Sequence, residues 1–117
     1  MKFTVSKTFA FEAAHSLPGL PEGHKCRNLH GHSYVFEVFC TGPLDERGFV
    51  IDYAEISAAV DPLVAMLDHK NINEVLFIPT TAENLGAWLF DRIAKALPLL
   101  DRVCVYETAK TCVRVEK

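Results

Sequence analysis

The 117-residue sequence lacks the features that would place a protein in a membrane or on a nucleic acid. No segment approaches the ~20 apolar residues that a membrane-spanning helix needs. The apolar residues near the N-terminus are interrupted by Lys7 and Glu12, so they do not form the continuous core of a signal peptide. There is no run of lysine or arginine, and the formal net charge is -3, which argues against a nucleic-acid partner. We therefore expect a soluble, cytoplasmic protein.

The sequence also has no Cys-x-x-Cys pair among its four cysteines, which are Cys26, Cys40, Cys104 and Cys112. Without an export signal, we expect free thiols rather than disulfides. Half of the residues are hydrophobic and 23% are charged, which is a globular composition. At this length, with no repeat or linker, we expect one domain over residues 1 to 117.

Alternating hydrophobicity predicts four strands. The first begins at Phe3 and keeps its apolar residues on one parity through Ala13, with Lys7 as the exception. The second covers residues 32 to 42, and its apolar residues on both parities suggest that both faces are covered. The last two, residues 102 to 108 and 111 to 116, are separated by a turn short enough for a hairpin.

Two helices are expected between the strand pairs. Residues 52 to 67 begin with Asp52 as a candidate N-cap, and Pro62 predicts a bend or two abutting segments. The second helix is predicted to begin at Thr80 as its N-cap and to end before Pro98. The order strand, strand, helix, helix, strand, strand indicates an α+β fold, with two helices on one face of a four-stranded antiparallel sheet. Its two open edges make oligomerisation a fair expectation.

Three histidines are predicted to converge. His30 and His32 lie two residues apart at the start of the second strand, so their side chains leave the same face. His15 shares the parity of the apolar residues in the first strand. Because the first and second strands are expected to be adjacent, its side chain can point to the same side of the sheet as those of His30 and His32. Three imidazoles are typical of a catalytic zinc site, because they leave a fourth position open. We interpret the three as metal ligands and His24 as a loop residue.

Cys26 lies in a polar loop and has two possible roles. It could be a fourth ligand, which would close the site and indicate a structural metal. Alternatively, a metal or cationic neighbours such as Lys25 and Arg27 would favour its thiolate, which could then act as a base. The residues alone do not decide between these roles.

Three further residues are weaker candidates. Asp68 and His69 are adjacent at the end of the first helix, where an aspartate could tune an imidazole for proton transfer or simply be solvated. Glu107, at the end of the third long strand, is either an ordinary edge carboxylate or an anchor for a ligand with N–H donors.

Taken together, the segments "FEAAH", "CRNLHGHSY", "IDYAEI", "LDHKNIN", "PTTAENL" and "YET" resemble the 6-pyruvoyl-tetrahydropterin synthase / 6-carboxy-tetrahydropterin synthase family, which has the tunnelling fold. The segments occur in family order over almost the whole chain. The three residues between Cys26 and His30 resemble the bacterial 6-carboxy branch, which belongs to queuosine biosynthesis. The continuation "ETAKTC" after Glu107 departs from the family pattern, which leaves that wall of the pocket undefined.

The resemblance implies roles for seven residues. The zinc ligands would be His15, His30 and His32, the catalytic base Cys26, the proton relay Asp68 and His69, and the pterin anchor Glu107. The implied enzyme converts 7,8-dihydroneopterin triphosphate to 6-carboxytetrahydropterin, acetaldehyde and triphosphate. Alternatives are a 6-pyruvoyl-tetrahydropterin synthase and a non-catalytic metal-binding or pterin-binding module. The resemblance also implies a barrel of subunits, in trimers or hexamers, with active sites between them.

Overall fold

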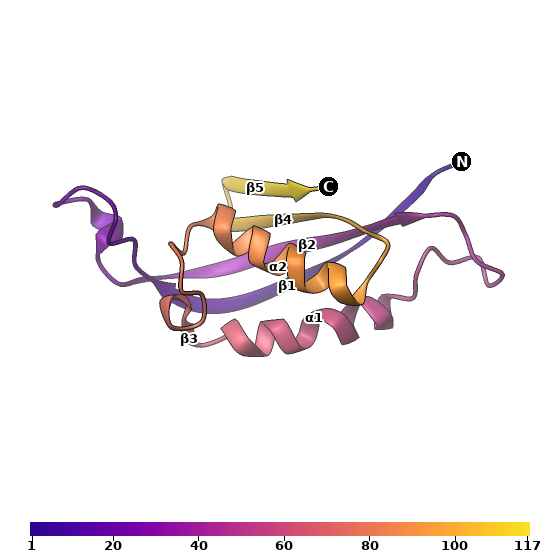
Figure 1. Ribbon diagram of the computed structural model, residues 1–117, viewed down its shortest axis with the longest axis horizontal. Helices are drawn as coiled ribbons and strands as arrows, with labels where there is room; N and C mark the ends of the chain where they lie inside the picture. The colour runs from indigo at the N-terminus through magenta and orange to yellow at the C-terminus, as the bar shows by residue number, and fades with distance from the viewer.

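A computed structural model describes residues 1–117, and it consists of one sheet with two α-helices on one of its faces (Figure 1). The strands are β1 Phe3–His15, β2 His30–Gly42, β3 Lys70–Asn71, β4 Leu100–Thr108 and β5 Thr111–Glu116. The α-helices are α1 Tyr53–Leu67 and α2 Ala82–Ala96, and the 3-10 turns are η1 Lys25–Arg27 and η2 Ile72–Glu74. The predicted α+β class and the order of the long elements are confirmed.

The sheet has five strands instead of the predicted four, in the order β3-β1-β2-β4-β5. The additional strand, β3, has two residues and pairs in parallel with Ala13 and Ala14 of β1. A two-residue strand shows no periodicity, which is why the sequence pattern did not reveal it. The other pairings are antiparallel, and β1 pairs with β2 from Phe3↔Gly42 to His15↔His30 without a bulge.

The helix α1 begins as predicted, because the Asp52 carboxylate accepts a hydrogen bond from the Ala54 N–H at 2.8 Å. Of the two outcomes expected at Pro62, a bend or two abutting segments, the second is wrong, since α1 is one helix from Tyr53 to Leu67. Proline has no N–H, so the Ala58 carbonyl lacks its usual helical hydrogen-bond donor. Pro62 and Ala58 are both exposed, so water can donate to that carbonyl instead. No helix has the length and hydropathy needed to cross a membrane.

The helix α2 begins one residue later than predicted. Its N-cap is Thr81, whose hydroxyl accepts from the Asn84 N–H at 3.2 Å, whereas Thr80 is buried at 1% exposure. The apolar residues Leu85, Leu89 and Ile93 of α2 are buried against the sheet. Because Thr80 does not cap the helix, its polar groups are directed elsewhere, toward the end of β1.

The core is one cluster of 20 buried residues between the sheet and the helices. Aromatic rings of β1 and β2 stack in pairs, with centroids 4.9 Å apart for Phe11 and Tyr34. Lys7, the charged residue on this parity, reaches across to donate a hydrogen bond to Ser57 of α1. The exception to the predicted pattern is therefore satisfied by a helix residue.

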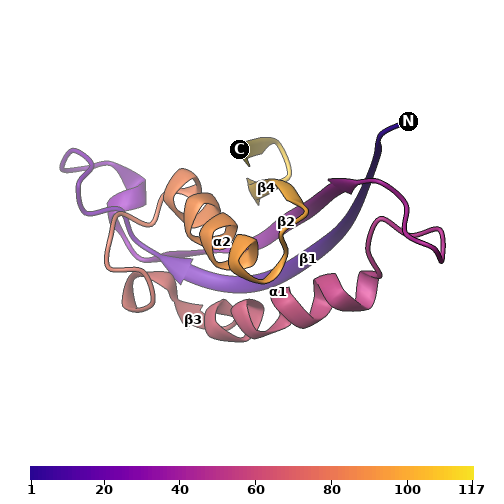
Figure 2. The same ribbon diagram turned by 45° about the vertical axis from the view of Figure 1, so that its right-hand side comes forward.

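The second face of the sheet is not covered by this chain, as both views of the ribbon show (Figures 1 and 2). The expectation that β2 is covered on both sides is thus wrong within one chain, because Val35 and Phe39 remain half-buried on the open face. The shape is elongated, 56 × 24 × 22 Å. The outer side of β1 is paired only at Ala13 and Ala14, so most of this strand is an open edge.

We predict that Gly86→Ala destabilises the protein although alanine is the better helix former. A methyl group at this position of α2 would lie 2.8 Å from Cγ2 of Val115 in β5, closer than packing allows. Overpacking of this kind costs about 1–3 kcal/mol. Urea unfolding of Gly86→Ala in wild-type and Val115→Ala backgrounds tests this, because the penalty should shrink in the second background; equal penalties would contradict the proposed contact.

Candidate functional site

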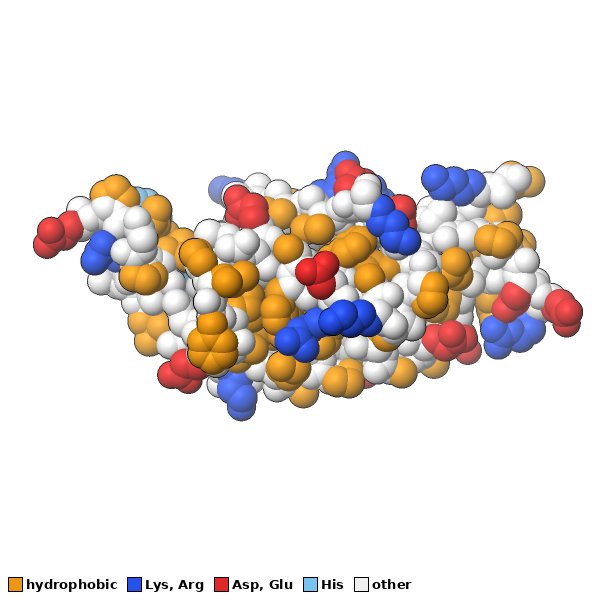
Figure 3. Space-filling model, in the orientation of Figure 1, with side chains coloured by type: hydrophobic (Ala, Val, Ile, Leu, Met, Phe, Trp, Pro, Cys, Tyr) orange, Lys and Arg blue, Asp and Glu red, His pale blue; other side chains and the backbone are white.

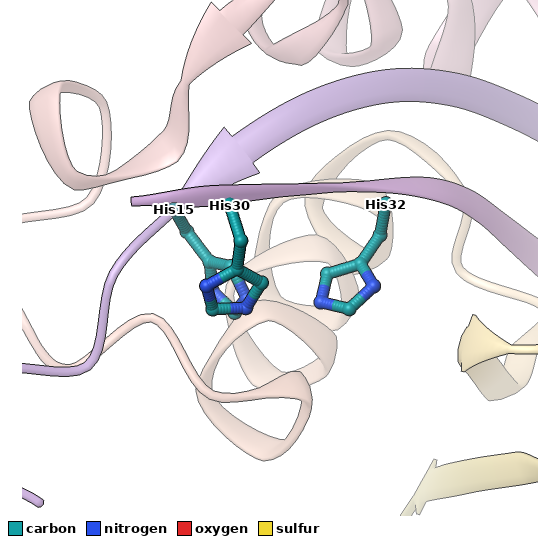
Figure 4. A group of neighbouring side chains, drawn as sticks. All are labelled: His15, His30 and His32. Atoms are coloured by element: carbon teal, nitrogen blue, oxygen red, sulfur yellow. The ribbon is translucent and has the colours of Figure 1, made fainter. Parts of the chain in front are cut away.

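His15, His30 and His32 converge on the helix-covered side of the sheet (Figure 4). One ring nitrogen of each lies within 4.8 Å of the other two. His15 ends β1 and pairs directly with His30 of β2, and His32 follows two residues along that strand. The convergence predicted from strand parity is confirmed.

Hydrogen bonds fix the orientation of two of the rings. Nδ1 of His15 lies 2.8 Å from the Thr80 carbonyl oxygen, and Nδ1 of His30 lies 2.7 Å from that of Asn28. A carbonyl can only accept, so each Nδ1 carries the proton and donates it. Each Nε2 therefore presents a lone pair, the form in which imidazole binds a metal.

The cluster contains polar atoms without partners. Nε2 of His15 and Nε2 of His32 are buried and make no hydrogen bond. Burial also lowers the pKa of His15, against the smaller opposing effects of the Thr80 carbonyl and Glu107, so this ring favours its neutral form. Tetrahedral zinc at about 2.1 Å from each nitrogen needs ligands about 3.4 Å apart, a small closure of this group. The donor set fits a metal ion.

Glu107 of β4 lies beside the histidines. Its carboxylate oxygens are 3.4 Å from Nε2 of His32 and 3.9 Å from Nε2 of His15, and its side chain is 27% exposed. Tyr34 lies under it with a buried hydroxyl group that has no partner. Burial and then the charge of Glu107 raise the pKa of Tyr34, so the phenol stays protonated. The carboxylate thus lies between the histidine cluster and the solvent.

Cys26 lies in η1, within the loop of residues 16–29 that extends from one end of the sheet (Figure 1). Its N–H donates to Nδ1 of His24, and its carbonyl accepts from the Leu17 N–H at 2.8 Å. The thiol is half-buried and is not part of the three-histidine cluster. It therefore does not act as a fourth ligand in this conformation. All four cysteines are free, as expected.

Asp68 and His69 form a pair that is held against β1. The carboxylate of Asp68 lies 3.0 Å from Nδ1 of His69 and also accepts from the Glu12 N–H at 2.9 Å. The Glu12 N–H first, and then His69, hold the pKa of Asp68 below its usual value. The His69 N–H donates to the Glu12 carbonyl, and the backbone of His69 is left-handed, with φ at 59°.

The structure does not bring this pair to the histidine cluster of the same chain. His69 lines a cavity of about 560 Å³ that His32 also borders, together with Glu12 and Ser33, whose side chains hydrogen-bond to each other. In β1 and β2 these two residues alternate with His15 and His32, so they point to the opposite, open face. His69 therefore lies on the face of the sheet opposite to the three histidines.

Glu107 lines a separate cavity of about 300 Å³ at the start of α2. Its other lining residues are Leu17, Thr81, Ala82, Glu83, Val105, Thr111, Cys112 and Val113. Acidic and basic side chains are interspersed over the face in Figure 3, and no area of one sign dominates it. Glu107 and Glu83 are thus the two charged residues of a small, mainly apolar recess.

The sequence did not reveal which backbone groups orient the histidine rings by hydrogen bonds. Thr80 was assigned to helix capping, yet its carbonyl orients His15, and Asn28 does the same for His30. The double threonine at positions 80 and 81 was the available signal, since only one of two neighbouring residues can be the N-cap.

Similarity to known proteins places the chain in a class of enzymes. The profile of a family described as 6-pyruvoyl tetrahydropterin synthase matches residues 4–117. A 6-carboxy-5,6,7,8-tetrahydropterin synthase of Synechocystis is 40% identical over 94% of this chain and 90% of its own. A dihydroneopterin monophosphate aldolase of Pyrococcus furiosus is 34% identical over 99% of both chains.

Solved structures agree. The 6-pyruvoyl tetrahydropterin synthase of Caenorhabditis elegans superposes with a TM-score of 0.91 and 26% identity, covering 100% of this chain and 96% of its own. That of Plasmodium falciparum, with a TM-score of 0.81 and 18% identity over 99% and 98% of the chains, shares the fold. The chain belongs to the 6-pyruvoyl tetrahydropterin synthase family.

We predict that His69→Gly is more stable than His69→Ala by about 1 kcal/mol, because left-handed backbone is costly for any residue with a Cβ and free of that cost for glycine. Urea unfolding of the two variants side by side measures the difference. Equal stabilities, or a more stable alanine variant, would show that residue 69 is not held in the left-handed conformation in solution.

Proposed function

We propose that this protein is a zinc-dependent 6-carboxy-5,6,7,8-tetrahydropterin synthase acting on 7,8-dihydroneopterin triphosphate. The observation that carries the proposal is the three-histidine cluster with partnerless Nε2 atoms beside Glu107. The 40% identity to the Synechocystis enzyme of that name supports the choice of reaction. We expect the product to feed queuosine or related 7-deazapurine synthesis in the cytoplasm.

The proposed metal ligands are His15, His30 and His32. Three neutral nitrogens would leave one position of a tetrahedral zinc ion open, as catalytic sites require. When bound, zinc would supply Lewis-acid polarisation of oxygen atoms on the substrate side chain. The Thr80 and Asn28 carbonyls would keep the rings of His15 and His30 oriented toward it.

Glu107 is the proposed pterin anchor. An ionised carboxylate accepts two parallel hydrogen bonds, and the pyrimidine edge of a pterin offers neighbouring ring N–H and amino donors. The recess of about 300 Å³ next to it has apolar walls suited to a flat ring. Bound there, the substrate would direct its hydroxylated side chain toward the histidine cluster, in which Nε2 of His15 and Nε2 of His32 lie within 4 Å of the carboxylate.

Proton transfer is assigned to Cys26 and to the pair Asp68 and His69. The Cys26 thiolate would remove a proton from a side-chain carbon, and His69, oriented by Asp68, would return one elsewhere. The Cys26 carbonyl accepts a hydrogen bond from the Leu17 N–H, and Leu17 also lines the recess. The loop that carries the thiol would therefore lie next to the bound ring. With water consumed, the triphosphate leaves, the outer two side-chain carbons depart as acetaldehyde, and the first side-chain carbon stays on the ring as the carboxylate.

The site would be shared between subunits. One chain places His69 on the face opposite to its own histidine cluster, so we assign the pair that serves a given cluster to a neighbouring chain. The open edges of β1 and β5 offer backbone groups for joining sheets into a barrel. A homotrimer or homohexamer is the proposed assembly.

Mass spectrometry of products from the zinc-loaded protein and 7,8-dihydroneopterin triphosphate tests the reaction. We expect 6-carboxytetrahydropterin and acetaldehyde from the wild type, and a loss of at least about 100-fold in rate for Cys26→Ala, because a general base contributes about 10²–10⁴-fold. Cys112→Ala, which removes an exposed thiol, is the matched control. A 6-pyruvoyl product would indicate the sister reaction, and ligand binding without turnover would favour a binding module.

Mixed oligomers test the sharing of the site. Cys26→Ala and His69→Ala should each be inactive alone, but refolding them together should restore about a quarter of the wild-type activity by random assortment. The restored fraction should follow the product of the two mole fractions and be highest at equal mixing. If the mixture stays as inactive as its components, Cys26 and His69 act from the same chain and the shared site is wrong.

A second candidate reaction is aldol cleavage of dihydroneopterin monophosphate. It is favoured by the Pyrococcus relative, which matches 99% of both chains. Breaking the bond between the first two side-chain carbons would give 6-hydroxymethyl-dihydropterin and glycolaldehyde phosphate. Supplying the monophosphate in the same mass-spectrometric assay separates the two reactions, since only the aldolase releases these products.

A further inference from the structure

Asn73 makes contacts that the proposed mechanism does not use. Its side-chain amide bonds to both backbone groups of Ser16, the residue directly after His15. The Ser16 N–H donates to Oδ1 at 2.9 Å, and Nδ2 donates to the Ser16 carbonyl at 3.0 Å. β3 stops pairing with β1 at Ala14, so the amide supplies two strand-like bonds just beyond the end of the ladder.

Thr80 joins the same group. Its hydroxyl lies 3.2 Å from Oδ1 of Asn73 and 3.3 Å from the Ser16 carbonyl, within reach of both acceptors. The carbonyl of Thr80 accepts the Nδ1–H of His15. Two groups decide where Nε2 of His15 points: the backbone at Ser16 and Thr80, which orients the ring. Asn73 contacts both of them.

Asn73 is itself held in place. Its N–H donates to Oδ1 of Asn71, which caps η2, at 3.0 Å. The residue between them, Ile72, is fully buried in the core. The amide is thus a preformed group, and its position does not depend on a flexible side chain finding the site.

We propose that Asn73 is a positioning residue of the metal centre. It holds His15 as the Nδ1–H tautomer with Nε2 directed at His30 and His32. This inference rests on the proposed metal centre. The purely structural alternative is that Asn73 only ties the segment after β3 to β1, in which case its loss would lower stability and leave metal affinity unchanged.

Zn²⁺ affinity, measured by competition with a chromophoric chelator, separates these alternatives. We expect Asn73→Ala to weaken binding by about 10–100-fold, the usual effect of losing a group that orients a metal ligand. Asn73→Asp keeps the oxygen that accepts from Ser16 but replaces the Nδ2–H donor with a second acceptor beside the Ser16 carbonyl, so it should also weaken binding. Asp52→Ala, which removes the cap of α1, is the matched control, because it lowers stability without contacting the site.

The tautomer of His15 can be measured without any metal ion. Nitrogen-15 NMR of the histidine rings should show His15 as a single Nδ1–H tautomer in the wild type and as a mixture in Asn73→Ala. Wild-type affinity in Asn73→Ala, or an unchanged tautomer, would overturn the positioning role. A wild type that binds no divalent metal would instead overturn the metal centre itself.

Discussion

The uninterrupted pairing of β1 with β2 is the constraint on which the rest of the structure depends. Thirteen residues of each strand face one another, and this register places His15 opposite His30 at the last pair. The same register stacks Phe11 on Tyr34, at the position where the core meets the site. Because strand side chains alternate, a slip by one residue would send the His-x-His pair to the uncovered face. The core and the three-histidine cluster are therefore specified by one set of backbone hydrogen bonds.

The C-terminal end of β1 is where separate parts of the chain meet. Glu12 bonds through its backbone to Asp68 and His69, and Ser16 bonds to Asn73. The stretch "LDHKNIN" thus contains the short strand β3, which pairs with β1, and hydrogen bonds to Glu12 and Ser16 lie on either side of this pairing. This arrangement places the proposed proton relay and the proposed support of His15 on one rigid edge.

The parts of the site that could be predicted from sequence are those governed by strand periodicity. The period of two is strict, so the convergence of His15, His30 and His32 followed from their parities. Thr80 and Asn73 could not be predicted in the same way, because they reach the end of β1 across more than fifty residues of intervening chain. The two-residue β3 carried no periodic signal, and the effect of Pro62 depended on exposure that only the packed helix shows.

The loop of residues 16–29 connects β1 to β2. A backbone hydrogen bond from the Leu17 N–H to the Cys26 carbonyl closes the loop near its base. Cys26 is therefore located by this bond and by its distance back from His30, whereas Glu22 and Gly23 at the tip make no hydrogen bond to it. The cost of closing a loop grows slowly, by about 0.6 kcal/mol for each doubling of its length. Relatives with longer or shorter tips here can keep the three histidines and the thiol in place, which makes this tip a place where chain length can change during evolution.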